Sequence, residues 1–382
     1  MLTIFCTKNP NIGTHPHPSL LPQEEEIAFT INMEDTDETT FSNILPYPES
    51  ERFQIGNDSL LANIYHGILP YHFAIDSQKR LYIAQWTTNT INVYSQDGEY
   101  LYSIGKSGFG PGELQRLRYF TFDSSYQTLY VLDQYEVEIF TLIETSYEFK
   151  DSFKHNLFLP ETMCVLGSNL YISGFINNKE QFVENIKGIN GFDLKTLEHK
   201  NTFGYTYYSF QKILVHTRTL SSMLISCNKE TNTVVGQLRE FPYMFGYTKE
   251  GEEKWSARIG NFESAQFPET SEPSMTLRPN KDFYNHFFPF RATDLGKYEL
   301  IQIGYRYPSS QLYKILTNEP LNDLIYDGPE VTSVLVNTNN GELIISNRYP
   351  IVGAVKDSLI ITADRGDSIP QAYTNTFYFH EF

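Results

Sequence analysis

Residues 73–105 decide the fold, and they read FAIDSQKRLYIAQWTTNTINVYSQDGEYLYSIG. Three short runs with alternating apolar residues, Phe73–Ile75, Leu81–Ala84 and Ile91–Tyr94, are separated by polar turns. The dipeptide Asp97-Gly98 then predicts a tight hairpin that leads into a fourth run. Alternation with a period of two residues is typical of β-strands, so this stretch predicts one four-stranded antiparallel sheet.

The same unit recurs along the chain. A second clear copy begins at Phe120, and fainter copies continue to the end of the sequence. The central leucine of each copy, or its equivalent, falls at residues 81, 129, 170, 224, 300 and 359. Such spacings suit one four-stranded blade per copy, because radial stacking of blades buries both faces of every sheet. We therefore predict an all-β fold, a six-bladed β-propeller of four-stranded antiparallel blades, with a seven-bladed ring or another β fold as the alternatives.

Closure of this ring requires a strand from the N-terminal region, because the sixth copy contains only three strands. The apolar run Ile27–Ile31 is predicted to complete that blade by antiparallel pairing between the two ends of the chain. Two further runs, Val334–Val336 and Glu342–Ile345, fit blade five, blade six or a seventh blade equally well.

The N-terminal region differs from the rest of the sequence. Residues 1–24 are predicted to be a tether or a residual lipoprotein signal region, and residues 25–382 a single β-propeller domain. Cys6 follows a short apolar run, Met1–Phe5, which resembles the end of a bacterial lipoprotein signal. We expect a lipidated Cys6 and a location in the periplasm or at the cell surface; the alternative is an ordinary terminus on a soluble protein.

Composition excludes some partners. The formal net charge is -17 and Lys and Arg form no cluster, so nucleic-acid binding is not expected. No run of 18 apolar residues occurs, so we expect no transmembrane segment. We also expect a monomer in solution. Cys164 and Cys227 lie in strand-like apolar runs and are interpreted as buried free thiols.

A glycine-rich segment carries a resemblance to a known family. Residues 105–114 read GKSGFGPGEL and follow a strand that ends in Ile-Gly. This segment resembles the inter-blade signature of bacterial six-bladed NHL-like propellers, in particular uncharacterised exported lipoproteins. The resemblance implies the fold and export, and it carries over no catalytic residue. A phosphate-binding loop is the alternative, but no helix start follows, so a structural turn is predicted.

Residues at the start of the inner strands are the candidate ligand-binding residues, because they can face the mouth of the propeller axis. Arginine would bind an anion and tyrosine would stack on a sugar, so a small anionic or carbohydrate ligand fits this set. The alternative is that these residues only bond neighbouring blades. Asp76 and Asp123 recur at equivalent turns and are predicted to stabilise them. The candidates are Tyr71, His72, Arg118, Tyr119 and Arg291.

No catalytic signature stands out in the sequence. We therefore predict an exported, non-enzymatic propeller that binds a protein or a small ligand, with no cofactor. The alternative is a metal-dependent enzyme of the lactonase or lyase type, in which side chains from several blades hold a divalent cation in the central channel. A structural partner in an envelope complex is the third hypothesis.

Overall fold

The structure is a computed structural model. It describes residues 27–47, 72–85, 88–177, 186–205, 218, 221–239, 241, 243–260, 295–302 and 332–348 in full. It adds the strand backbone at 54–55, 284–294, 303–307, 330–331, 352–356, 359–365 and 375–381. Within these residues, the strands form six sheets of four or five strands and one two-stranded sheet. Six blades follow from this count, as the sequence repeat predicts.

Blades 1 and 2 match the sequence prediction strand for strand. In each, the first strand of the repeat is at one edge of the sheet and the fourth is at the other, joined by antiparallel pairing throughout. Blade 1 contains β3 (Phe73–Ile75), β4 (Leu81–Gln85), β5 (Thr90–Tyr94) and β6 (Tyr100–Ile104). Blade 2 contains β7 (Tyr119–Phe122), β8 (Thr128–Leu132), β9 (Glu136–Ile143) and β10 (Ser146–Lys154).

Blades 3 and 4 keep the four-stranded pattern, but in blade 4 the expected order is shifted by one strand. Leu224, predicted in the second strand of its blade, lies in the first strand instead. A small sheet of β11 (Leu157–Phe158) and β14 (Phe175–Ile176) lies beside blade 3. Blade 3 contains β12 (Met163–Leu166), β13 (Asn169–Ser173), β15 (Ile189–Asp193) and β16 (His199–Phe203). Blade 4 contains β17 (Met223–Asn228), β18 (Thr233–Leu238), β19 (Tyr243–Tyr247) and β20 (Glu253–Ile259).

Blades 5 and 6 settle where the two ambiguous runs belong. The runs near residues 334 and 343 are the third and fourth strands of blade 5, so they form no seventh blade. Blade 5 contains β21 (Tyr284–Leu295), β22 (Tyr298–Tyr307), β23 (Glu330–Asn337) and β24 (Leu343–Ser346). Blade 6 contains β25 (Val352–Lys356), β26 (Leu359–Arg365), β27 (Asn375–Glu381) and the N-terminal β2 (Gln54–Ile55).

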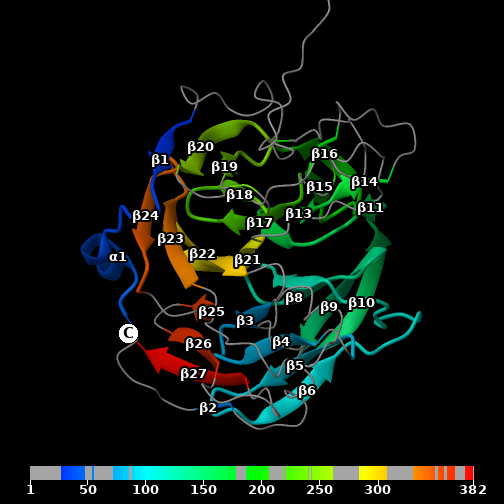
Figure 1. Cartoon of the computed structure of the whole chain (residues 1–382). Helices are drawn as coiled ribbons and strands as arrows, with labels where there is room; N and C mark the ends of the chain where they lie inside the picture. The colour runs from blue at the N-terminus through cyan, green and yellow to red at the C-terminus, as the bar shows by residue number, and fades with distance from the viewer. Residues whose placement is uncertain are drawn as a thin grey trace, which may run out of the picture.

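The blades surround a common axis. Figure 1 shows β3, β17, β21 and β25 toward the centre of the ring, and β6, β10, β24 and β27 at its periphery. The first strands of blades 2 to 6 adjoin one another in turn, and β25 of blade 6 adjoins β3 of blade 1. Apolar side chains fill the space between blades, for example Tyr82 and Val93 of blade 1 against Phe120 and Phe140 of blade 2. The first strand of each blade is therefore the inner strand.

The strand that closes the ring is not the one predicted. Ile27–Ile31 was expected to pair with the last blade, but β1 (Phe29–Ile31) pairs in parallel with β20, the outer strand of blade 4. The shorter β2 pairs with β27 instead, antiparallel as predicted for a closing N-terminal strand. A segment of only two residues can close the sheet because the backbone supplies the ladder hydrogen bonds.

A short helix connects these two N-terminal strands. Helix α1 (Glu38–Ile44) begins at Asp37, whose carboxylate accepts a hydrogen bond from the Thr40 N–H at 2.9 Å. Phe41 and Leu45 are fully buried and pack against Leu335 and Ile344 of blade 5. We call β1, α1 and β2 the N-terminal strap, because they contact the outer parts of blades 4, 5 and 6 in turn.

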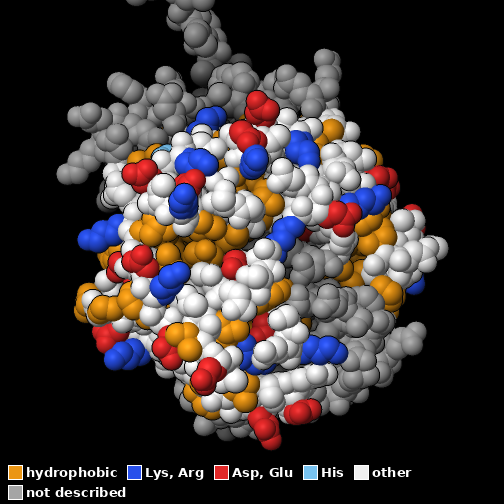
Figure 2. Space-filling model, turned by 180° about the vertical axis from the view of Figure 1, so that it is seen from behind, with side chains coloured by type: hydrophobic (Ala, Val, Ile, Leu, Met, Phe, Trp, Pro, Cys, Tyr) orange, Lys and Arg blue, Asp and Glu red, His pale blue; other side chains and the backbone are white. Residues whose placement is uncertain are grey.

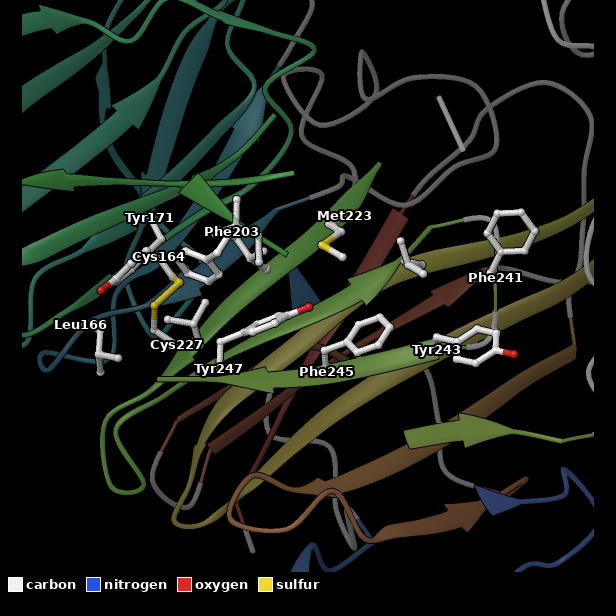
Figure 3. Close-up of a cluster of buried hydrophobic side chains, with 14 residues drawn as sticks. Cys164, Leu166, Tyr171, Phe203, Met223, Cys227, Phe241, Tyr243, Phe245 and Tyr247 are labelled. Carbon is white, nitrogen blue, oxygen red and sulfur yellow. A yellow bond between two sulfur atoms is a disulfide. The ribbon is translucent and has the colours of Figure 1, made fainter. Parts of the chain in front are cut away.

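The two cysteines of the inner strands form a disulfide rather than free thiols. Cys164 on β12 is bonded to Cys227 on β17, with the two Cα atoms 5.5 Å apart. Figure 3 shows the bond among Tyr171, Phe203 and Tyr247, in the apolar layer between blades 3 and 4. Burial of both cysteines was predicted correctly, but the pairing was not, because it depends on inner strands of different blades meeting at the axis.

Candidate functional site

The end of the propeller where the inner strands begin is called the axial mouth below. There, in blades 1, 2 and 4, a backbone hydrogen bond joins the residue just before the inner strand to the end of the second strand of the same blade. The backbone carbonyl of His72 accepts a hydrogen bond from the Ala84 N–H, and the backbone N–H of Arg118 donates to the Leu132 carbonyl at 2.8 Å. In blade 4, the Arg239 N–H donates to the Ser222 carbonyl at 2.9 Å. Side chains at these positions therefore belong to one end of the ring.

The structure describes three of the five predicted binding residues in full. His72, Arg118 and Tyr119 lie at the axial mouth, and their role in ligand binding stays a prediction. Arg291 lies inside β21, paired with Ile301, and not at the start of that strand; its role in binding stays a prediction. Tyr71 and the predicted lipidation residue Cys6 lie outside the described residues, as do residues 1–24 of the predicted tether.

His72 and Tyr119 bond blade 1 to blade 2. Their rings are stacked with centroids 3.6 Å apart, and the His72 ring also meets the edge of Phe120. The Nε2 of His72 donates to the backbone carbonyl of Phe120. Burial lowers the pKa of His72 to about 3, against the opposing effect of that hydrogen bond. His72 is therefore neutral at pH 7 and supplies no positive charge to the mouth.

Hydrogen bonds fix the backbone at Arg118, whereas its side chain keeps one donor without an acceptor. The Asp133 carboxylate accepts hydrogen bonds from the N–H groups of Gln115 and Arg116, which fixes the linker that leads to Arg118. The guanidinium is half-buried, and its Nε has no hydrogen-bond partner. Burial and the nearby Arg116 lower the pKa of Arg118, whereas the negative charges of Glu161 and Asp133 act in the opposite direction.

Two charged residues of the mouth were missed by the sequence analysis. Glu161 lies just before β12 in blade 3, and Arg239 follows β18 in blade 4. Arg239 Nη1 donates to Glu161 Oε1 at 2.8 Å, so an ion pair joins the two blades. The other carboxylate oxygen, Glu161 Oε2, is buried and has no hydrogen-bond partner. The repeat copy of blade 3 is faint and lacks the Phe and Asp that mark the first strand in Phe73–Asp76 and Phe120–Asp123, so it gave no signal for Glu161. No sequence signal marked Arg239.

Further polar groups without partners lie at the same end of blades 3 and 4. Arg218 is buried, its guanidinium carbon lies 4.8 Å from the centre of the Phe158 ring, and its Nε has no hydrogen-bond partner. Gln237 is fully buried near the end of β18, and neither amide atom has a partner. Buried polar atoms are normally hydrogen-bonded, so unpaired atoms gathered at one end of a fold indicate a place for a ligand or water.

The glycine-rich linker between blades 1 and 2 is a structural turn, as predicted. Glu113 accepts hydrogen bonds from the N–H groups of Phe109 and Gly110, at 3.0 and 2.9 Å. Lys106 forms an ion pair with the same carboxylate at 2.9 Å and lowers the pKa of Glu113. The N–H groups that would bind a phosphate are thus already occupied by the chain's own carboxylate.

Glu138 on β9 is buried beneath this linker. Its carboxylate accepts a hydrogen bond from the Gly112 N–H, and its Oε2 has no partner. Burial and the negative charges of Glu136 and Asp133 raise the pKa of Glu138 to about 7. Because the folded chain binds this proton more tightly than the unfolded chain, stability falls as the pH rises from about 4.5 through 7.

We expect Glu138→Gln to stabilise the protein at pH 8 by about 1 to 2 kcal/mol, because the amide removes a buried negative charge. At pH 5 the wild-type side chain is protonated, so the two proteins should have the same stability. Urea unfolding curves at both pH values measure the difference. A variant that is destabilised equally at both pH values would show that the charge of Glu138 is not the cause.

Neither an excess of one charge on the face seen from behind nor a metal-binding cluster marks a second candidate site among the described residues. On the face seen in Figure 2, Lys and Arg side chains are interspersed with Asp and Glu, so neither sign dominates that face. Among the residues described, no three His, Cys, Asp or Glu side chains are grouped to hold a metal ion. The predicted absence of a cofactor stays a prediction, because the side chains of β25, β26 and β27 lie outside that set.

Comparisons with known proteins agree with this architecture. Residues 74–233 match the family DUF5128, described as a 6-bladed beta-propeller. The chain is a β-propeller. The match covers the clear repeat copies and the faint ones as far as blade 4. The finer prediction, an NHL-like propeller of lipoprotein type, stays a prediction.

Two solved structures from Bacteroides are similar to this propeller. A protein of Bacteroides fragilis NCTC 9343, described as a candidate for export, has a TM-score of 0.56 at 11% identity; the match covers 93% of this chain and 99% of that one. A member of the DUF4221 family from Bacteroides vulgatus ATCC 8482 has a TM-score of 0.53 at 11% identity and coverages of 86% and 97%. At this identity the likeness shows the fold alone. No curated protein matches the sequence.

One structural result bears on the membrane. None of the helices in the described part of the propeller is long and apolar enough to cross a membrane.

Proposed function

We propose that this propeller is an exported binding protein that holds a small anionic ligand at the axial mouth, without catalysis. The observation that carries the proposal is the unpaired Nε of Arg118, beside the Glu161–Arg239 ion pair that joins blades 3 and 4. A guanidinium that is partly withdrawn from water and lacks a partner favours an anionic acceptor, since a charge-assisted hydrogen bond offsets the cost of burial.

Two observations support export. An intrachain disulfide between Cys164 and Cys227 is typical of proteins outside the reducing cytoplasm. The similar Bacteroides fragilis protein is also described as a candidate for export. We further propose that Cys6 is the lipidated residue. Mass spectrometry of the mature N-terminus tests this, because lipidation would make Cys6 the first residue and add acyl chains.

The binding proposal is tested by calorimetric titration with two monoanionic acids, D-glucuronate and cyclohexanecarboxylate, and with D-glucose as the neutral control. We expect at least one acid to bind, and Arg118→Gln to weaken its binding about 10-fold or more, the size of one charge-assisted hydrogen bond. Arg116→Gln is the matched control: it removes the same charge two residues away, from an exposed side chain. Equal losses in both variants, or no binding of either acid, would contradict the proposal.

A further inference from the structure

The axial mouth presents unpaired atoms of opposite hydrogen-bonding character. The Nε of Arg118 carries a hydrogen and can only donate, and it has no acceptor. The Oε2 of Glu161 belongs to the carboxylate that pairs with Arg239; it can only accept, and it has no donor. Arg118 directly precedes β7 and Glu161 lies two residues before β12, and these two neighbouring inner strands are in contact, so both groups lie at the same end of adjacent strands. The charge of Glu161 also acts on Arg118. A ligand that satisfies both must bring an acceptor and a donor.

The charges at the site narrow the class of ligand further. Glu161 already shares its Oε1 with Arg239 at 2.8 Å, so these two charges compensate each other. Arg118 and Arg116 together then face the single negative charge of Asp133, so one positive charge is in excess, which favours a ligand with a single negative charge. A zwitterionic amino acid has a net charge of zero and does not compensate it. A sulfate or a simple carboxylate offers acceptors only, and it would place a second negative charge near Glu161 Oε2.

We infer that the axial mouth selects a hydroxylated monocarboxylic acid, whose carboxylate accepts from Arg118 and whose hydroxyl donates to Glu161 Oε2. This inference rests on the proposed function and adds the donor requirement to it. Glu161 is then the residue that sets specificity, because a site built to receive a hydroxyl rejects the analogue that lacks it. Arg239 positions the carboxylate by holding Oε1, which leaves Oε2 for the ligand.

Three probes separate the two requirements. D-Glucuronate has the carboxylate and the hydroxyls, cyclohexanecarboxylate has a similar ring and charge without hydroxyls, and D-glucose has hydroxyls without the charge. Calorimetric titrations should show D-glucuronate binding about 10-fold or more tightly than either of the others. In Glu161→Gln, the preference for D-glucuronate over cyclohexanecarboxylate should shrink about 5-fold or more, because the amide is a weaker acceptor and no longer repels the carboxylate.

Each outcome has a distinct meaning. If cyclohexanecarboxylate binds as tightly as D-glucuronate and both depend on Arg118, the donor requirement is wrong and the anion site stands. An unchanged preference in Glu161→Gln would also overturn the inference, because Glu161 would then take no part in selection. If neither acid binds the wild-type protein, the proposed function itself fails. Circular dichroism of each variant confirms that the fold is intact, and Glu161→Asp, which keeps the charge, should retain more of the preference than Glu161→Gln.

Discussion

Replacing both Cys164 and Cys227 by alanine is expected to lower the free energy of unfolding by about 4 kcal/mol. The disulfide closes a loop of 63 residues, and losing a cross-link over that length frees the unfolded chain to explore many more conformations. The bond also joins the inner strands of blades 3 and 4, so its loss acts where two blades meet. Urea unfolding of the oxidised proteins measures the difference.

A reducing agent supplies the internal control for this experiment. Reduction should bring the wild-type protein close to the stability of the double-alanine variant, whereas the variant should not respond to the reductant. If the wild type keeps its full stability after complete reduction, the disulfide contributes nothing and the apolar layer around Tyr171 and Phe203 holds the two blades by itself.

Asp76→Ala is expected to destabilise the protein by about 3 to 5 kcal/mol, because it leaves the buried Arg80 without its counter-charge. Arg80 Nε donates to Asp76 Oδ2 at 2.7 Å, and both residues are less than 10% exposed. Arg80 Nη1 also donates to the Thr145 carbonyl of blade 2 at 2.6 Å, so the pair orients a contact between blades. Thermal and urea unfolding measure the loss.

The equivalent turn of blade 2 offers a matched control. Asp123 accepts a hydrogen bond from the Gln127 N–H at 3.0 Å and makes the same kind of turn, but it is only half-buried, and Gln127 takes the place that Arg80 has in blade 1. Asp123→Ala should therefore cost about 1 kcal/mol, the size of one turn hydrogen bond. In the double variant Asp76→Ala/Arg80→Met, part of the lost stability should return, since no unpaired charge is left buried. Equal effects of the two aspartate variants would show that the ion pair is unimportant.

The prediction from sequence was most accurate in the blades where the strand pattern and the turns are both clear. Blades 1 and 2 carry regular alternation and clear turns, so each of their strands was placed correctly from Phe73 to Phe153. Asp76 and Asp123 were predicted to stabilise turns, and both accept backbone N–H groups there. In these blades the turn chemistry and the strand pattern indicate the same structure.

The prediction failed where a residue's role depends on a neighbouring blade. The first strand of blade 4, Met223–Asn228, is buried along its whole length, so its pattern is indistinguishable from that of a central strand. The partner of Cys164 and the partner of Glu161 both lie on blade 4, at sequence separations that no local pattern records. The closing strand was placed on the longer apolar run, whereas the structure uses the two-residue β2.

The closing strand has a consequence for how the chain reaches its native state. Gln54 pairs with Tyr378, so blade 6 joins residues from opposite ends of the sequence. The four strands of each of blades 1 to 5 come from one continuous segment, and β1 is added at the outer edge of blade 4. Contacts at long sequence separation carry a large loop-closure cost and slow the folding of β proteins. During synthesis from the N-terminus, Gln54 would emerge early and wait for its partner until nearly the whole chain is made. Blade 6 would therefore assemble last, and an open ring with an unpaired β27 edge would be the species that needs protection from aggregation.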